Sequence, residues 1–375
     1  ENQTDIDLSA AGTVTVGGGF TLQSVNTTRY AGRRAQKIWH AFLQHEWTPL
    51  SQLHIIAGLR YDHNSAFAAR VSPKIALQYR VHETLRFTAS YGGGFKAPDF
   101  RQLYLSFVNN AADGYSIFGA SEFSLALLQQ QMRQGMIAQI LPAAAQITSL
   151  RPEISNGINA CMHWKPVAGF TMDVNLFRND IRNLINYIPV ATQANGTAVF
   201  SYVNTRRAFT QGVELQVEQK LNEQWQLSGG YQFLETADKD ILQAVKAGTV
   251  FGREVPGAAA RRMQLRDYHG LLNRSKHMAN LRLFYQHQQR GWSGSLRFIY
   301  RSRLGVLDLD GNNFANMKAE FAPSILQVNI AVGKNITKHL ALQTGVNNLL
   351  NQTNARFMPN MAGTHYFVTI QYTHK

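Results

Sequence analysis

The chain is organised as short segments in which apolar and polar residues alternate with a period of two. Near the C-terminus Leu340, Leu342, Thr344 and Val346 interleave with small or polar residues, and residues 326–333 show the same alternation. Successive side chains of a strand point to opposite faces, so each segment has an apolar face and a polar face. The pattern predicts strands with one face suited to hydrocarbon and the other suited to water.

The connections between these segments alternate between tight turns and longer excursions. Strands of about ten residues, with short turns at one end and long loops at the other, are typical of a transmembrane β-barrel. We therefore expect an all-β fold, an antiparallel transmembrane barrel to which this chain contributes about 14 strands. The predicted strands cover residues 13–23, 37–47, 52–61, 70–79, 83–95, 154–165, 169–190, 197–219, 223–235, 276–289, 291–303, 323–334, 338–348 and 364–374.

The composition agrees with a membrane location. The 375 residues suffice for one large barrel or two soluble domains, only 16% of them are charged and 11% are aromatic. Trp47, Trp164, Trp225 and Trp292 fall at predicted strand ends, where aromatic belts lie at headgroup depth. No apolar run of 18 residues predicts a transmembrane helix, and the single Cys161 excludes an internal disulfide framework.

The net charge is strongly positive, since 37 Lys and Arg residues face 23 Asp and Glu residues, giving +14. These bases either pair with lipid and lipopolysaccharide phosphates of the outer leaflet or attract an anionic solute. No nucleic-acid partner is expected, because the bases are not gathered on one helix or sheet face. The basic residues in predicted loops include Arg29, Arg33, Arg34, Arg261, Arg262, Arg266, Arg274 and Lys276.

The longest connection, about 96–153, is too long for a simple loop. We predict a helix that Ser121 caps and Pro142 ends. The apolar face of this helix either packs against neighbouring loops or forms a flexible, methionine-lined lid over an apolar ligand. The residues of that face are Leu125, Leu128, Met132, Met136 and Ile140.

The most distinctive stretch is Tyr91–Tyr104, which reads YGGGFKAPDFRQLY. Glycines at a strand end permit close backbone approach, and Pro98 then stops the ladder. The stretch closely resembles the YG-x-x-F-(R/K)-A-P-x-x-x-x-L-Y segment of TonB-dependent outer-membrane receptors, and the match includes Phe95, Lys96, Ala97 and Pro98.

Four further segments resemble that family in the family's own order, so the likeness extends over about residues 90–375. They are LRPE with Leu150, Pro152 and Glu153, FRNDIRNLI at 177–185, YVN at 202–204 with GVE at 212–214, and VNNLLN at 346–351 with Asn347 and Leu349.

The resemblance implies a 22-stranded barrel filled by an N-terminal plug that binds the inner-membrane energy-coupling protein. Residues 1–375 would then be the C-terminal portion of the outer-membrane barrel domain, with the long, partly helical loop at about 96–153 on the extracellular side. Glu1–Leu8 is polar and not a signal peptide, so the true N-terminus, the plug and the first strands are expected elsewhere. The expected partners are the plug and remaining strands, the TonB-type energy-coupling complex, outer-membrane lipid and lipopolysaccharide, a small-molecule ligand and, optionally, a surface lipoprotein.

The family imports scarce, bulky nutrients across the bacterial outer membrane. The resemblance therefore implies energy-coupled import of an iron complex, either haem or a ferric siderophore. A cobalamin receptor of the same family and a complete 14-stranded passive porin remain as alternatives. A soluble β-sandwich adhesin is disfavoured, because the polar strand face with Glu214, Gln216 and Glu218 would have to enter a packed core.

Aromatic residues of the long loop are candidates for contact with a flat macrocycle, although they would also suit packing of the loop on itself. In haem receptors a loop histidine between the two motifs supplies an axial iron ligand, but residues 99–150 contain none. Other side chains could substitute, and His269 beside Tyr268 is the best remaining histidine. The candidate substrate-binding residues are Phe100, Tyr104, Phe107, Tyr115, Phe118, Met132, Met136, Tyr268 and His269.

No catalytic residue, metal site or cofactor is predicted. The remaining histidines show no i,i+4 pair or His-x-His spacing, and no nucleophile motif such as Gly-x-Ser-x-Gly occurs. We therefore do not expect an enzyme.

Overall fold

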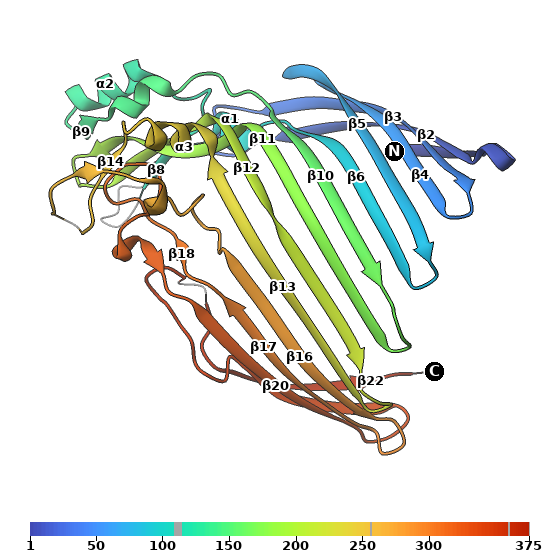
Figure 1. Ribbon diagram of the computed structural model, residues 1–375. Coiled ribbons are helices and arrows are strands. Elements are labelled where there is room, and N and C mark those ends of the chain that lie inside the picture. The colour runs from blue at the N-terminus through green and yellow to red at the C-terminus, as the bar shows by residue number, and fades with distance from the viewer. Residues whose placement is uncertain (109–114, 256, 359–360, 375) are drawn as a thin grey trace. The chain divides into compact units, whose positions relative to one another are not determined.

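A computed structural model describes residues 1–108, 115–255, 257–358 and 361–374, and antiparallel strands form most of it (Figure 1). Each of the 14 predicted strands corresponds to one strand of the described residues, which confirms the all-β fold class. These strands are β2 (Thr13–Val25), β3 (Arg34–Leu50), β4 (Leu53–Asn64), β5 (Phe67–His82), β6 (Leu85–Lys96), β10 (Glu153–Trp164), β11 (Phe170–Gln193), β12 (Ala198–Lys220), β13 (Trp225–Asp238), β16 (His277–His287), β17 (Trp292–Arg301), β20 (Ile325–Asn335), β21 (Leu340–Asn347) and β22 (His365–Tyr372).

Besides the short strands of the connections, one longer strand, β1 (Asn2–Asp7), was not predicted. It pairs antiparallel with β2, with Asn2 opposite Gly18 and Asp7 opposite Thr13, after a 3-10 turn η1 (Ser9–Ala11). Its sequence NQTDID contains a single apolar residue, Ile6, so it has no apolar face from which a period of two could be recognised.

The connections contain shorter elements. Between β6 and β10 lie α1 (Phe100–Tyr104), β7 (Ser106–Phe107), β8 (Ser116–Phe118), α2 (Leu125–Arg133), β9 (Ile137–Ile140) and η2 (Pro142–Gln146). Between β13 and β16 lie α3 (Lys239–Lys246), β14 (Phe251–Gly252), β15 (Arg261–Arg262) and η3 (Leu265–Asp267). Between β17 and β20 lie β18 (Leu304–Gly305), η4 (Lys318–Glu320) and β19 (Phe321–Ala322).

The helix predicted from Ser121 to Pro142 was wrong at both ends. Ser124 caps α2 instead, since its Oγ accepts a hydrogen bond from the Leu127 amide at 3.1 Å. Gly135, at φ 75°, ends the helix in a backbone conformation that L side chains rarely adopt. The following apolar residues form β9, which pairs with the end of β11.

The chain divides into two compact units. The first contains Glu1–Leu77, Ser90–Ile158 and Asn179–Ala208, and the second contains Gln78–Ala89, Asn159–Arg178 and Phe209–Lys375. In the first unit β1 to β4 pair in sequence order, and β8 pairs in parallel with the start of β12. Its apolar cores lie among the elements of the long connection, where Leu128, Val190 and Val199 are almost wholly buried.

In the second unit β13, β16, β17, β20, β21 and β22 form consecutive antiparallel pairs. Several of these strands lie side by side in Figure 1. Gly291, at φ 64°, makes the tight turn between β16 and β17. The short turns and longer connections therefore alternate within this unit as the sequence predicted.

The sheet of the second unit separates apolar from polar side chains. Asn280 lies opposite Ile299, which lies opposite Gln327, whereas Leu281 lies opposite Phe298. Directly opposed side chains of an antiparallel pair share a face, so neighbouring residues of β16 belong to different faces. One face carries Gln232, Asn280, Arg297, Gln327 and Asn329, and the other carries Leu281, Phe298, Tyr300, Leu326, Ile330 and Val368.

Many side chains of the apolar face are exposed and not covered by other parts of the described chain. Val368 and Ile370 are 68% and 70% exposed, and Leu281, Leu326 and Ile330 are exposed as well. Exposed apolar surface of this extent suits contact with lipid. Among the described residues, no helix is both long and apolar enough to cross a membrane.

Candidate ligand-binding loops

The loop motifs of the first unit are joined by the side-chain amide of Asn204. Its Nδ2 donates hydrogen bonds to the Arg151 and Asn183 carbonyl oxygens at 2.9 and 2.7 Å, and its Oδ1 accepts one from the Arg151 amide at 2.7 Å. One side chain thus connects the end of the long loop with β11 and β12. The sequence offered Asn204 only as part of the YVN motif, without this role.

The other motif residues of this unit form the base of the loop. The Lys96 Nζ lies 3.1 Å from the Glu153 Oε2, and the Glu153 Oε1 accepts a hydrogen bond from the Ile185 amide at 2.8 Å. Pro98 is almost completely buried and Leu150 is buried in an apolar cluster. These contacts fix the backbone from which the loop extends.

Four rings of this unit form a continuous group, which we call the aromatic platform: Phe107, Tyr115, Phe200 and Tyr187, in order of contact. Successive ring centroids lie 6.0, 6.1 and 5.7 Å apart in edge-to-face geometry. The Arg29 guanidinium lies 4.9 Å from the Phe107 ring centroid. Tyr115 and Tyr187 are 52% and 56% exposed, so the platform offers aromatic edges and faces to a ligand.

The other predicted aromatic residues of the long loop lie outside the platform. The ring centroids of Phe100 and Tyr104 lie 6.3 Å apart, and the Arg34 guanidinium lies 4.4 Å from the centroid of the Tyr104 ring. Arg34 also forms an ion pair of 2.7 Å with Glu122. Phe118 is only 5% exposed and packs in the apolar core, so it is not available to a ligand in this conformation.

The two predicted methionines lie at the end of α2. Met132 and Met136 are 40% and 50% exposed, whereas Leu128 on the same face is completely buried. The apolar face of the helix therefore packs into the core through Leu128, whereas the two methionines remain exposed.

In the second unit, Tyr268 and His269 occupy the connection between β13 and β16. The Tyr268 hydroxyl accepts a hydrogen bond from the Asp238 amide at 2.8 Å, and burial raises the pKa of Tyr268 to about 12. Its ring packs edge to face on Phe314 at 5.1 Å. Tyr268 therefore supports the loop, and its hydroxyl oxygen is already engaged by the Asp238 amide.

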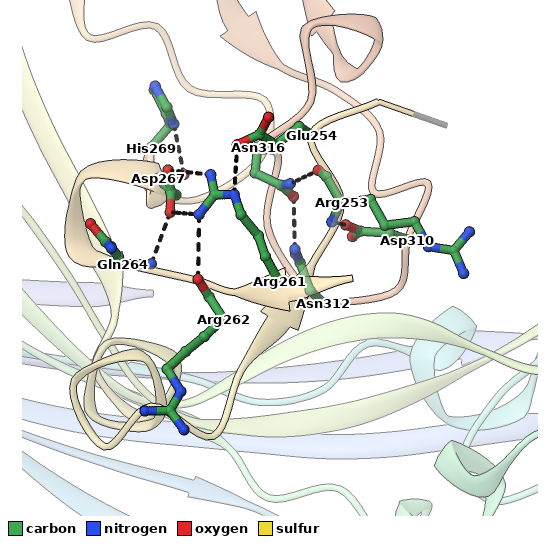
Figure 2. Close-up of polar contacts among 10 residues, drawn as sticks. All are labelled: Arg253, Glu254, Arg261, Arg262, Gln264, Asp267, His269, Asp310, Asn312 and Asn316. Carbon is green, nitrogen blue, oxygen red and sulfur yellow. Dashed lines mark hydrogen bonds and ion pairs between the residues drawn. The ribbon is translucent and has the colours of Figure 1, made fainter. Parts of the chain in front are cut away.

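His269 is exposed, but both ring nitrogens have partners. Its Nδ1 lies 2.9 Å from the Asp267 carbonyl oxygen, and its Nε2 lies 3.1 Å from the Arg303 Nη2 (the first of these contacts is drawn in Figure 2). A guanidinium can only donate, so the Nε2 accepts and the proton is on Nδ1. Iron ligation by His269 would require Arg303 to move.

Arg261 organises the same loop, as Figure 2 shows. Its guanidinium contacts both Asp267 oxygens at 2.8 and 3.0 Å and the Glu254 Oε1 at 2.8 Å. The hydrogen bond from Arg261 is the main cause that lowers the pKa of Asp267. The bidentate geometry makes this pair stronger than an ordinary surface ion pair.

The connection between β17 and β20 contains a group of carboxylates, Asp308, Asp310 and Glu320. One ligand atom of each lies within 4.8 Å of the others. Burial raises the pKa of Asp308 to about 6, and the nearby charges of Asp310 and Glu320 add to that rise. Carboxylate oxygens are the kind of ligand that a hard divalent cation prefers.

The polar face of the second unit is also hollowed. A cavity of about 820 Å³ is lined by polar and apolar side chains of several adjacent strands. The polar ones include Asn175, Glu214 and Arg297, and the apolar ones include Met278 and Ile299. The Glu214 carboxylate is already held there, by hydrogen bonds from Asn175 at 3.1 Å and Gln232 at 2.7 Å. The polar part of this wall is therefore pre-ordered at Glu214.

Comparison with known proteins assigns the family. The model of the TonB-dependent receptor-like β-barrel matches residues 2–349, which is most of the chain. The chain belongs to this family. The family is one of transport receptors, and its β-barrel fold agrees with the antiparallel strands and separated faces described above.

Individual relatives are more distant. Heme/hemopexin utilization protein C of Haemophilus influenzae is 27% identical over 204 residues, covering 50% of this chain and 26% of that protein. The siderophore receptor PirA from Pseudomonas aeruginosa aligns with a TM-score of 0.67 at 15% identity over 99% of this chain and 55% of its own. A mutant of the ferric enterobactin receptor PfeA from Pseudomonas aeruginosa, in complex with enterobactin, gives 0.68 at 15% identity over 99% and 53%. The chain thus spans about a quarter to a half of the length of these proteins.

Within the VNNLLN motif of the receptor family, the structure buries Asn348, which the sequence analysis did not single out. Asn348 is only 3% exposed, and its Nδ2 donates hydrogen bonds to the Gln352 and Ala362 carbonyl oxygens at 2.8 and 3.0 Å. Asn347 and Leu349, which were singled out, are exposed. The motif therefore fixes the loop after β21 mainly through Asn348.

Two groups of potential ligand-binding residues were missed by the sequence analysis. Tyr187 and Phe200 complete the aromatic platform from the facing ends of β11 and β12, and no local pattern distinguishes them from belt residues. Asp308, Asp310 and Asn312 alternate along the chain, and this spacing was a signal that could have been used.

Proposed function

We propose that this chain forms part of the wall and outer loops of an outer-membrane receptor that imports a bulky iron complex with flat aromatic faces, a haem or a ferric siderophore. Family membership supports a receptor, and the aromatic platform with Arg29 is the observation that carries the choice of ligand class. Stacking on exposed rings suits a macrocycle or an aromatic chelator, and the guanidinium suits its negative charge.

The proposed location is the bacterial outer membrane, with the barrel crossing it many times. The apolar face of the second unit would contact lipid, and the polar face would line the lumen. This assignment explains why Val368 and Ile370 are exposed on the face opposite the one that carries Asn280 and Gln327.

The relatives support iron complexes over cobalamin as the cargo. The curated relative is named for heme and hemopexin utilization, and the solved relatives include siderophore receptors. Because Arg303 holds the Nε2 of His269, we propose that the loops hold the complex mainly through ring contacts and charge, without His269 as an iron ligand.

The proposed partners follow from the same family. Energy would come from an inner-membrane TonB-type complex acting through an N-terminal plug inside the completed barrel. Loop bases that have no ion pair to a described residue, such as Arg262 and Arg266, would contact lipopolysaccharide phosphates. A surface lipoprotein remains an optional further partner.

Growth of a deletion strain tests the function. The strain should lose growth when haem or an aromatic ferric siderophore is the sole iron source, and the cloned gene should restore it only when the TonB-type complex is present. Restoration without that complex, together with ion conductance of the purified protein, would instead indicate a passive porin. Loss of cobalamin-dependent growth alone would indicate the cobalamin alternative.

Ring variants test the ligand site in the full-length protein. Each aromatic pair contributes about 0.5–1.5 kcal/mol beyond area burial, so combining Tyr115→Ala with Tyr187→Ala should weaken binding by about tenfold or more. Phe251→Ala removes a ring that is 54% exposed but lies outside the platform, and it should leave affinity unchanged. Equal affinity of the double variant and the wild type would contradict the platform as the binding site.

A further inference from the structure

The cavity on the polar face of the second unit lies at the loop end of its strands. Arg301, which lines it, is the last residue of β17 before the long connection to β20. Met358, which also lines it, belongs to the connection after β21. The volume of about 820 Å³ is in the range of pockets that enclose a drug-sized molecule. The cavity is therefore large enough for a bulky organic ligand.

The acidic side chains of this cavity already have donors within the protein. The Glu214 carboxylate accepts hydrogen bonds from the Asn175 and Gln232 amide groups at 3.1 and 2.7 Å. The Asp173 Oδ1 lies 2.5 Å from the His163 Nδ1. Since a carboxylate only accepts, the His163 Nδ1 carries the proton of this bond. Both carboxylates are thus engaged by neighbouring side chains and do not require a ligand.

The basic side chains of the same cavity have no comparable partner. Arg297 and Arg301 are four residues apart on β17, so they point to the same face. The Arg301 Nη2 lies 2.6 Å from the Met358 Sδ, and a thioether is only a weak acceptor. Neither guanidinium forms an ion pair with a residue that the structure describes. Because a guanidinium has five N–H donors, the cavity offers positive charge and donors that the protein leaves unused.

Sulfur and hydrocarbon groups form much of the remaining wall. Met278 lies directly opposite Arg301 in the pairing of β16 with β17, and Met358 and Met361 also line the cavity. Ile299 stands between the two arginines on the same face of β17. Methionine side chains adapt to irregular apolar shapes and contact aromatic rings favourably. The cavity therefore combines an adaptable apolar surface with two available guanidiniums.

We propose that this cavity is a second cargo site, separate from the aromatic platform, which binds an organic anion with a flat apolar body. Carboxylates or similar oxyanions of the ligand would accept hydrogen bonds from Arg297 and Arg301, since the guanidinium fork matches their geometry. The methionines would contact the apolar body. The inference rests on the proposed function, because it assigns the same class of cargo to a further site and adds that the cargo is anionic.

Fluorescence titration of the full-length protein in lipid nanodiscs with gallium protoporphyrin tests the site, with empty nanodiscs as the background. This probe has a flat apolar ring and two carboxylates. Tyr115→Ala combined with Tyr187→Ala weakens the platform, so saturable binding in this double variant reports the cavity. We expect such binding, and we expect the dimethyl ester of the probe, which has no carboxylate charge, to bind about tenfold more weakly or worse.

Removal of charge from the cavity should have the same effect as esterification of the probe. In the double-variant background, Arg297→Gln and Arg301→Gln should each weaken binding of the probe about tenfold or more. Arg301→Lys keeps the positive charge and should bind more tightly than Arg301→Gln, which a merely structural loss would not produce. Arg282→Gln is the matched control, because Arg282 lies opposite Arg297 on the same face but does not line the cavity. It should leave affinity unchanged.

Unchanged affinity of Arg297→Gln and Arg301→Gln would overturn the site. Equal weakening by Arg282→Gln would overturn it too, because the effect would then be one of general charge. Equal affinities for the acid and its ester would overturn the choice of an anion. Absence of probe binding in the double variant, as when another part of the full-length protein fills the cavity, would overturn the site and leave the growth test of the receptor unaffected. Failure of that growth test would instead overturn the proposed function, so the two failures are distinguishable.

Discussion

Replacement of Asn348 by alanine should destabilise the protein more than replacement of either of two nearby asparagines. The Asn348 side chain makes three hydrogen bonds, two from Nδ2 and one to Oδ1 from the Gln352 amide at 3.0 Å. Its φ of 51° is a conformation that asparagine tolerates and alanine does not. At about 1 kcal/mol for each hydrogen bond and about 1 kcal/mol for the backbone, Asn348→Ala should lower the free energy of unfolding by roughly 4 kcal/mol.

The two neighbours provide graded controls. Asn351 has a φ of 49° and accepts one hydrogen bond, from the Thr364 amide at 3.1 Å, so Asn351→Ala should cost roughly 2 kcal/mol. Asn347 is exposed with an ordinary φ, and Asn347→Ala should change the free energy by less than about 0.5 kcal/mol.

Equilibrium urea unfolding of the full-length protein in lipid vesicles, followed by tryptophan fluorescence, measures all three variants. Similar losses for the three, or a loss below about 1 kcal/mol for Asn348→Ala, would refute the assignment of Asn348 as the residue that fixes this loop.

Three further predictions concern the faces, a loop ion pair and a close backbone approach. Leu281→Arg should destabilise the vesicle-embedded protein by about 2–4 kcal/mol, whereas Asn280→Arg on the opposite face should cost less than about 1 kcal/mol, as urea unfolding can measure. The pKa of Asp267 is lowered in the folded state, so its pair with Arg261 stabilises the protein at pH values above the ordinary pKa of 3.8. This stabilisation is lost as the pH falls through the lower pKa of the folded state. Arg261→Gln should therefore be less stable than the wild type at pH 7 and approach it in acid. A Cβ atom at position 119 would lie 2.4 Å from the carbonyl carbon of Leu103. Gly119→Ala should therefore speed proteolysis of the long loop without altering barrel migration on gels.

The long strands could be predicted because their side chains face two different environments. The period of two in residues 326–333 follows directly from one face in lipid and one in water, and β20 lies where it was expected. Strand β1 lacks this contrast, since Ile6 is the one apolar residue of its six, and its pairing with β2 depends on tertiary structure. The helix was misplaced because the apolar spacing continues through Gly135, where the backbone turns away.

The loop sites were predictable only in part. Phe107 and Tyr115 belong to the aromatic platform, but Tyr187 and Phe200 reach it through pairing of distant strand ends, which local sequence does not encode. Phe118 has the same residue type and lies in the core instead, because residue type alone does not distinguish a ring that binds from one that packs. The predicted role of His269 as a ligand contact remains a prediction.

The central claim, that neighbouring side chains of one strand face lipid and an aqueous lumen in turn, is tested most directly by a spin-label scan of β16. Single cysteines would be placed at positions 280–283 in a Cys161→Ser background, and the labelled full-length protein would be reconstituted in vesicles. We expect labels at positions 281 and 283 to be accessible to oxygen in lipid, and labels at positions 280 and 282 to be accessible to a water-soluble nickel reagent. Equal accessibility at all four positions, or the opposite alternation, would contradict it.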